Sequence, residues 1–279
     1  MKKKTLRVYR KSVSIVDESA VTIYQNLCAE KVGFLMESTD KENDSYTFMG
    51  VEPDALIQSD KDSLVITYND GRREVMKGNP LELLKEFYSQ FDVLPSESEL
   101  EFNGGLVGSL GYDFIRYTEK LPDDNPDEIG IETIQLMLAT KFIAIDHNAE
   151  VMTAVVLDED NEEGKQRALE AANELLKRAS SGEHQEDLDK KYVHDGVIIH
   201  KSDTLDDYTK KVNKIKQYIV DGHIFQTVLS QRWTIQTKRT GFNLYEELRQ
   251  LNPSPYLYYY NFGEFEVIGS SPEMVVKQV

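Results

Sequence analysis

The sequence predicts a protein of mixed strands and helices, in which short strands are frequent in the first half. Two pairs of strands are separated by turn signals. Ser63–Tyr68 and Arg72–Met76 flank an Asp-Gly pair, which favours a tight hairpin turn. Lys141–Ile145 and Val151–Leu157 flank a polar turn at 146–150 in the same way. The two hairpins indicate antiparallel sheet.

Helices are predicted where apolar residues recur every three or four positions. Residues 204–221 have this spacing, with acidic residues near the start and Gly222 at the end. Residues 158–179 begin acidic and end basic, which is the polarity that the helix dipole favours. A third helix is expected from Asn79-Pro80 to about Phe91, because proline is tolerated in the first turn.

The last third of the chain carries the signals of further strands. Residues 224–235 alternate in a way that predicts one long strand, and residues 274–279 are apolar and β-branched. Two shorter strands are expected at Tyr256–Asn261 and Glu264–Gly269. A strand at 274–279 would be left without a partner, which suggests that the chain stops in the middle of a sheet.

The domain boundary is expected in the most polar stretch of the chain, Ser180–Lys191. We therefore predict an N-terminal domain over residues 1–180, a linker over 181–196 and the beginning of a second domain over 197–279.

The composition excludes several classes of protein. The 279 residues include 32 Lys and Arg against 49 Asp and Glu, which gives a net charge of −17. Nucleic acids and anionic membrane surfaces are therefore poor partners. Cys28 is the single cysteine, so an intramolecular disulfide and a cysteine-based zinc site are both excluded. Neither a secretory signal nor an apolar run of about 20 residues is present, which favours a soluble, cytoplasmic protein.

Few residues suggest chemistry by themselves. The five histidines form no convincing triad, and the carboxylate clusters near 158–163 and 203–207 are explained by helix starts. Gln226, Arg232 and Glu273 are harder to dismiss, because polar side chains at strand ends often line clefts.

Several segments resemble motifs of anthranilate synthase component I, a family of chorismate-utilising enzymes. Gly222–Arg232 (GHIFQTVLSQR) resembles the family's GDIFQVVLSQR segment. Asn252–Tyr259 (NPSPYLYY) and Gly269–Met274 (GSSPEM) resemble its NPSPYM and GSSPE segments. Three upstream elements match in order and spacing: Phe34–Ser38, Tyr46–Gly50 and Gly104–Gly108. Six ordered elements make the resemblance specific over nearly the whole chain.

The resemblance implies an α+β fold of antiparallel sheets with flanking helices. It also implies conversion of chorismate and ammonia to anthranilate and pyruvate, with magnesium as cofactor and feedback inhibition by L-tryptophan. Ammonia would come from glutamine through a glutamine amidotransferase subunit, anthranilate synthase component II. In the family, the magnesium ligands and the substrate clamp follow the part that matches here. We therefore expect this chain to hold no metal ligands and to be inactive alone.

The resemblance also assigns roles to individual residues. Ser38 matches a tryptophan-contacting serine, and Pro255, Tyr256 and Leu257 match a second tryptophan-contacting stretch, with Leu257 where methionine is usual. Gln226 stands where water-using relatives carry a lysine base, which favours ammonia as the nucleophile. Glu273 aligns with the acid that protonates the departing hydroxyl, a role that burial of the carboxyl would favour.

Two alternatives stay open. Aminodeoxychorismate synthase component I shares the glutamine and a similar pocket, and its distinguishing lysine lies beyond the present sequence. A non-catalytic tryptophan-binding module is an alternative of another class. The NPSPY and FLMES strings favour anthranilate synthase.

Overall fold

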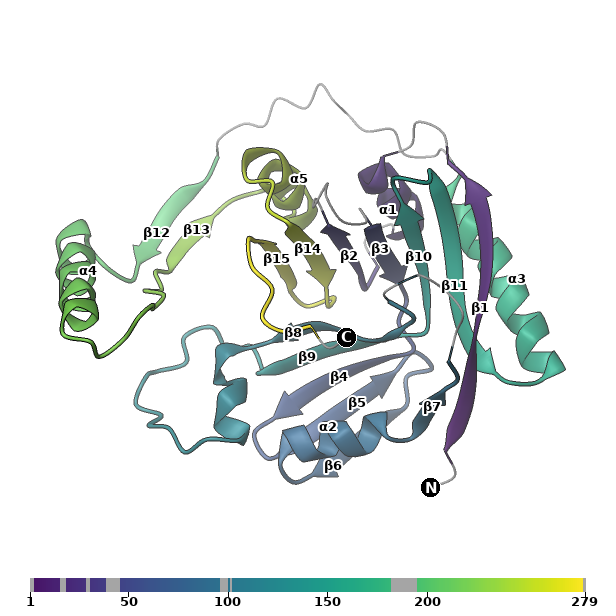
Figure 1. Ribbon diagram of the computed structural model, residues 1–279, viewed down its shortest axis with the longest axis horizontal. Helices are drawn as coiled ribbons and strands as arrows, with labels where there is room; N and C mark the ends of the chain where they lie inside the picture. The colour runs from purple at the N-terminus through teal and green to yellow at the C-terminus, as the bar shows by residue number, and fades with distance from the viewer. Residues whose placement is uncertain are drawn as a thin grey trace. The chain divides into compact units, whose positions relative to one another are not determined.

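The protein is described by a computed structural model that covers residues 3–15, 19–28, 31–38, 46–95, 100, 102–181 and 195–277 (Figure 1). Contacts divide the chain into two compact units. The first unit combines Met1–Glu186 with Gly241–Val279, and the second is Asp187–Thr240. This division differs from the boundary at 181–196 suggested by the sequence, because the last 39 residues group with the first unit. The assignment of two evolutionary domains stays a prediction.

An eight-stranded sheet forms most of the first unit, with the strand order β15-β14-β2-β3-β10-β11-β1-β7 (Figure 1). Its neighbours pair antiparallel, except for β1 and β7, which are parallel. The strands are β1 (Lys4–Ser14), β2 (Gly33–Ser38), β3 (Tyr46–Val51), β7 (Phe91–Val93), β10 (Lys141–Asp146), β11 (Val151–Glu159), β14 (Tyr256–Asn261) and β15 (Glu266–Ser271). This order places β14, from the C-terminal part of the sequence, beside β2, from the N-terminal part.

A second sheet in the same unit has five antiparallel strands in the order β6-β5-β4-β9-β8. Helix α2 (Pro80–Tyr88) packs on β5 and β6, and a 3-10 helix, η1 (Tyr112–Tyr117), follows β8. The strands are β4 (Ala55–Asp60), β5 (Ser63–Tyr68), β6 (Arg73–Lys77), β8 (Gly105–Leu110) and β9 (Ile134–Ala139).

The two faces of the eight-stranded sheet are buried by different partners. One face packs against α1 (Ala20–Cys28), α3 (Glu162–Ala179) and α5 (Gly241–Leu251). On the other face, Phe34 and Phe142 share a core cluster with Val107 and Met137 of the five-stranded sheet. Burial on both faces explains why β10 and β11 read as nearly continuous apolar runs.

The second unit contains β12 (Val197–Lys201), α4 (Leu205–Val220) and β13 (Trp233–Gln236). β12 and β13 form a two-stranded antiparallel ribbon. Within residues 195–240, no residue is buried. The described part of this unit therefore has no hydrophobic core of its own.

Most of the predicted elements are confirmed. Both hairpins form, with antiparallel pairing of β5 with β6 and of β10 with β11. The helix expected at 204–221 is α4, and the helix expected at 79–91 is the shorter α2. The helix expected from 158 begins at Glu162, because Asp158 and Glu159 still belong to β11.

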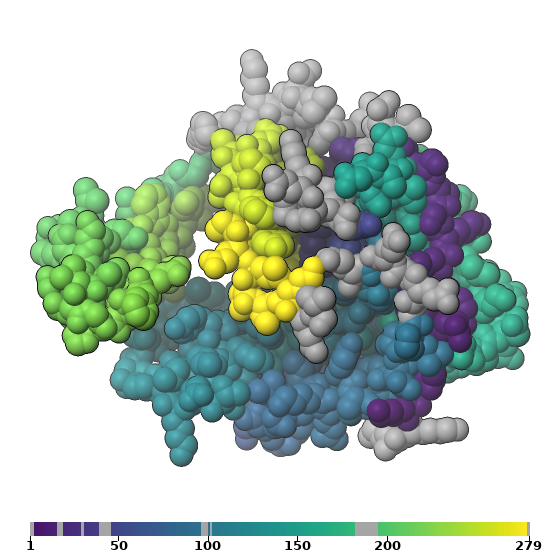
Figure 2. All heavy atoms as spheres, viewed as in Figure 1, coloured from purple at the N-terminus to yellow at the C-terminus, as the bar shows by residue number. Residues whose placement is uncertain are grey.

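Two predicted strands are wrong. Of the strand expected over 224–235, only the end pairs as a strand, β13 from Trp233, because β12 offers a partner of only five residues. Residues 274–277 form no strand, and Met274, Val275 and Val276 are exposed. Figure 2 shows this C-terminal segment, in yellow, at the surface. Residues 278 and 279 lie outside the described residues.

Candidate functional site

The predicted tryptophan-contacting residues come together where β14 pairs with β2. In the antiparallel register, Tyr256 lies opposite Ser38, and on its other side Tyr256 lies opposite Ser271 of β15. Directly opposed residues share one face of a sheet, so Ser38 and Tyr256 form a cross-strand pair. Pro255 immediately precedes this pair and is half-buried. Two segments more than 200 residues apart in the sequence are thus neighbours in the sheet.

Leu257 lies on the opposite face of β14 from Tyr256. It is 1% exposed and belongs to the core cluster beneath the helices, opposite Glu37. Its side chain is therefore separated from the face of Ser38 and Tyr256 by the sheet. Only the backbone of Leu257 is accessible from the face that carries Ser38 and Tyr256. The contact of Leu257 with tryptophan stays a prediction.

Aromatic rings lie next to the Ser38–Tyr256 pair on its own face of the sheet. The next row along the strands contains Tyr258, Met36 and Phe48, which are register partners of one another. Tyr258 stacks on Tyr260 with ring centroids 5.2 Å apart, and Phe48 stacks on Tyr46 at 5.9 Å. Flat apolar walls beside a hydroxyl are the features that an indole and a polar ligand group require.

A glycine allows the Tyr258 ring to lie across β15. Gly269 is the register partner of Tyr258. A Cβ placed on Gly269 would lie 2.0 Å from the Tyr258 ring, which is closer than any real contact. Glycine at this position therefore opens the surface on which the ring rests.

An ionic cluster around the buried Glu37 carboxylate lies on the helix-covered face of the same strands. Glu37, with a side chain 5% exposed, accepts three hydrogen bonds from Arg249 of α5. The distances are 2.8 and 3.1 Å from Nε and 2.9 Å from Nη2. The Tyr245 hydroxyl, also on α5, donates to the same carboxylate. Burial, reinforced by Glu37, raises the pKa of Tyr245, so its hydroxyl remains a donor.

His147 extends this polar cluster. Its Nε2 lies 2.7 Å from the hydroxyl of Thr47, which is the register partner of Glu37. Although part of the residue is exposed, desolvation lowers the pKa of His147. Glu37 opposes this effect, and Arg249 reinforces it. The His147 ring is therefore electrostatically coupled to the Glu37–Arg249 pair.

The motif comparison did not identify this cluster, although the sequence contained a signal. Leu35 and Glu37 are two residues apart in a strand, so they face the same side. Leu35 is fully buried, which places Glu37 in the core as well. A carboxylate at an inward position requires a polar or charged partner. Here that partner is Arg249 of α5, which the sequence alone did not indicate.

The two predicted catalytic residues lie in different units. Gln226 belongs to the second unit, where it is exposed and outside any strand or helix. Glu273 belongs to the first unit and is also exposed, just after β15. Its backbone accepts a hydrogen bond of 3.0 Å from the Ser271 hydroxyl. The exposure of Glu273 does not match the buried carboxyl expected of an acid, and the roles of both residues stay predictions.

The described residues do not fit a metal ion. Among them, no three His, Cys, Asp or Glu side chains converge as a ligand set. In the same part of the chain, no helix is long and apolar enough to cross a membrane.

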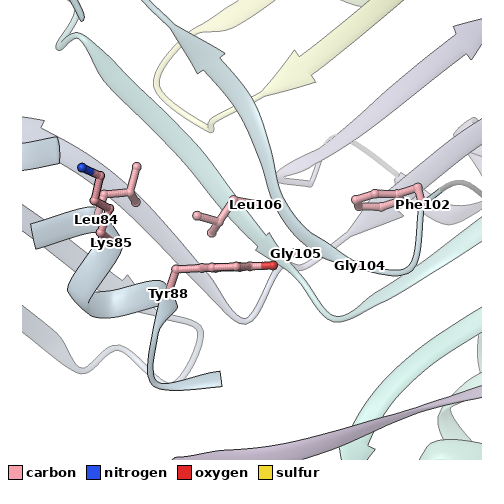
Figure 3. Close-up of a pocket in the computed structure, with 7 residues that line it drawn as sticks. All are labelled: Leu84, Lys85, Tyr88, Phe102, Gly104, Gly105 and Leu106. Atoms are coloured by element: carbon pink, nitrogen blue, oxygen red, sulfur yellow. The ribbon is translucent and has the colours of Figure 1, made fainter. Parts of the chain in front are cut away.

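A cavity of about 420 Å³ lies apart from the predicted site, between α2 and the start of β8. Figure 3 shows the Tyr88 ring pointing from α2 toward Gly105. None of its lining residues is among those predicted to act. They are Leu84, Lys85, Tyr88, Phe102, Gly104, Gly105 and Leu106.

Comparison with known proteins identifies the family. The family of chorismate binding enzymes matches residues 32–278. The chain therefore belongs to the chorismate binding enzyme family.

Individual relatives carry more specific names than the family does. The chain is 32% identical over 274 residues to anthranilate synthase component 1 of Acetivibrio thermocellus, and 33% identical over 270 residues to that of Pseudomonas putida. Each match covers 93% of this chain and 54% of the relative, so the chain spans about half the length of these relatives.

A solved structure supports the fold. Anthranilate synthase component I from Streptococcus pneumoniae is 24% identical, with a TM-score of 0.59, over 94% of this chain and 57% of that one. The α+β fold of antiparallel sheets with flanking helices is thereby confirmed.

Proposed function

We propose that the chain belongs to the large subunit of an anthranilate synthase. This enzyme converts chorismate and ammonia to anthranilate and pyruvate and is inhibited by tryptophan. The family match supports a chorismate enzyme, and the names of the relatives favour this reaction. The observation that carries the proposal is the pairing of Ser38 with Tyr256, because it joins two motifs that the resemblance assigns to one tryptophan site.

In the proposed reaction, Gln226 orients ammonia by hydrogen bonds, because an amide cannot act as a base. Glu273 protonates the departing hydroxyl. For this role the exposed carboxyl must be covered when substrate binds, since a buried acid holds its proton more strongly.

Magnesium and a glutamine amidotransferase partner complete the proposed enzyme. The described residues offer no ligand set for the metal, so no step is assigned to it here. The proposal places the ligands in the half of the relatives that this chain does not match. The partner would supply ammonia from glutamine.

The tryptophan site is tested by calorimetric titration of the purified chain with L-tryptophan. We expect saturable binding by the wild type. Ser38→Arg should weaken it about 5- to 150-fold, because a bulky cation replaces a hydroxyl that meets the ligand.

Ser14→Arg is the matched control, since it adds the same charge at an exposed strand end of the same sheet. This variant should bind tryptophan as the wild type does. Equal affinity of the Ser38→Arg variant and the wild type would contradict the assignment of Ser38.

The reaction is tested with the complete gene product, magnesium, chorismate and ammonium. Release of anthranilate supports the proposal, whereas aminodeoxychorismate as product would identify the related synthase. Tryptophan binding without turnover of chorismate would instead favour a non-catalytic binding module.

A further inference from the structure

We propose that Arg249 is a positioning residue of the tryptophan site, acting through Glu37 from the opposite face of the sheet. This inference rests on the proposed function, since it concerns the site at which tryptophan would bind. Arg249 and Glu37 do not face that site themselves. They join the two chain segments that carry its residues, and we refer to the pair as the Glu37–Arg249 clamp.

The clamp is tied to the site by the sequence on both sides. Glu37 immediately precedes Ser38, the last residue of β2. Arg249 lies in the last turn of α5, and only four residues separate that helix from Tyr256, the first residue of β14. Each half of the clamp is thus a short connection away from one half of the site.

The register places the clamp directly behind the site. Glu37 is the register partner of Leu257, and the adjacent pair in the same ladder is Ser38 with Tyr256. Successive residues of a strand point to opposite faces, so the clamp and the site lie on opposite faces of the sheet at adjacent positions of the ladder. A displacement of Glu37 would therefore be transmitted to Ser38 through a single peptide unit.

The contacts make this clamp stiff. The Glu37 carboxylate is almost fully enclosed and receives both an Arg249 fork and the Tyr245 hydroxyl. A forked guanidinium–carboxylate pair restricts distance and orientation together. Loss of Arg249 removes the positive charge that pairs with the enclosed Glu37 carboxylate, which forces the surrounding segments to move or to admit water.

The test combines tryptophan affinity with a direct readout of the clamp. Calorimetry measures tryptophan binding by Arg249→Met, Glu37→Gln and the double variant. NMR titration of His147 reports whether the pair is broken, because Arg249 lowers its pKa and Glu37 raises it. We expect both single variants to weaken tryptophan binding about tenfold, within the usual range of coupling between sites.

The double variant should bind no more weakly than the weaker single variant, because the two residues act as one unit. Arg249→Lys, which keeps the charge without the fork, should restore part of the affinity. Glu37→Gln nearly preserves the shape of the side chain, so this variant provides the test if Arg249→Met fails to fold.

Arg167→Met is the matched control, because it breaks a 2.6 Å ion pair with Asp158 elsewhere in the same unit. It should bind tryptophan as the wild type does.

Unchanged tryptophan affinity in Arg249→Met or Glu37→Gln, with a shifted His147 pKa, would overturn the inference and leave the proposed function intact. A wild-type protein that does not bind tryptophan would overturn the proposed regulatory site, and the inference with it.

Discussion

At the scale of the residue, His147 has a pKa that its surroundings shift. Desolvation lowers its pKa below the ordinary value near 6.5. The unfolded chain therefore takes up a proton at this residue before the folded protein does. Linkage then requires that the contribution of His147 to stability is complete above about pH 6.5 and is lost as the pH falls through its lower folded-state value.

The expected result is a free energy of unfolding that decreases as the pH is lowered from about 7 to 5. Urea denaturation at each pH measures this decrease. In the His147→Gln variant the slope should become smaller, because the titrating group is gone. A variant with the slope of the wild type would show that other groups cause the dependence.

At the level of single residues, the motifs located two segments that pair in the sheet, but they gave no contact between residues distant in the sequence. The FLMES and NPSPY motifs each named their residues, and the register of β2 and β14 joins them. The sequence contained no direct indication that Arg249 would meet Glu37, since that contact depends on where α5 lies. Leu257 shows a second limit, because a motif match does not report which face a side chain takes.

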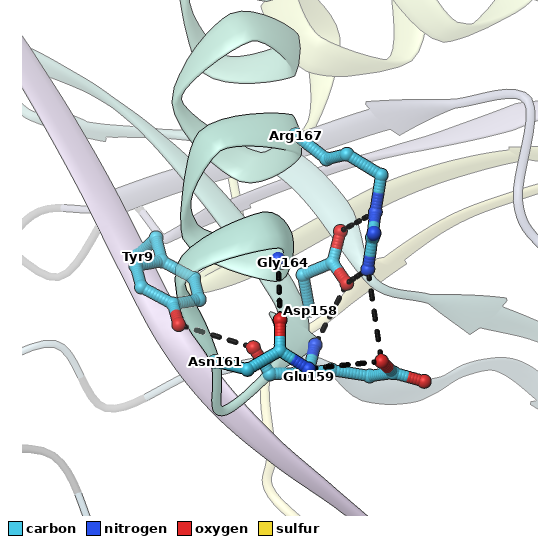
Figure 4. A network of polar contacts seen from close by, with 6 residues as sticks. All are labelled: Tyr9, Asp158, Glu159, Asn161, Gly164 and Arg167. Atoms are coloured by element: carbon cyan, nitrogen blue, oxygen red, sulfur yellow. Dashed lines mark hydrogen bonds and ion pairs between the residues drawn. The ribbon is translucent and has the colours of Figure 1, made fainter.

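At the scale of the element, the start of α3 shows how one side chain fixes a helix boundary (Figure 4). Asn161 is the N-cap, and its side-chain oxygen accepts a 2.7 Å hydrogen bond from the backbone of Gly164. Arg167 reaches back from the second turn to Asp158 at the end of β11. These contacts explain why the acidic residues at 158–159 finish a strand instead of beginning the helix.

We expect Asn161→Ala to lower the free energy of unfolding by about 1 kcal/mol, because the backbone N–H of Gly164 loses its acceptor. Chemical denaturation of wild type and variant measures the difference. Glu174→Ala, at an exposed position of the same helix, is the control and should change stability by less than about 0.5 kcal/mol. A loss in Glu174→Ala as large as that in Asn161→Ala would contradict a capping role.

The elements that sequence reasoning recovered share a local cause. The β5–β6 and β10–β11 hairpins need only a turn and two neighbouring strands. The strand expected over 224–235 needed a partner of equal length, and β12 supplies only five residues. Alternation of apolar and polar residues therefore indicated that the segment can form a strand, but it did not indicate whether a partner strand is present.

At the scale of the whole molecule, the two units differ in how much apolar surface they bury. The strands β9, β10 and β11 of the first unit are almost entirely enclosed. In the second unit, Leu205, Val220, Phe225 and Val228 are each at least 80% exposed. Burial of apolar surface is the main source of stability, so the first unit should be much the more stable.

Hydrogen exchange measures this difference directly. Amide protons of residues 197–236 should exchange much faster than those of β10 and β11 in the same protein, because opening the second unit exposes little additional apolar surface. Equal protection of both sets of amides would show that the second unit is stabilised as strongly as the first.

The position of β2 in the sheet has a consequence for synthesis of the chain. One neighbour, β3, follows almost at once, but the other, β14, begins more than 200 residues later. At roughly 5–20 residues per second, the ribosome needs about 10–45 s to supply it. During that interval one edge of β2 has free backbone donors and acceptors, which can pair with another chain. Nascent chains stalled before residue 256 should therefore bind a holdase chaperone more strongly than chains released beyond residue 271, as a pull-down of stalled ribosomes would measure.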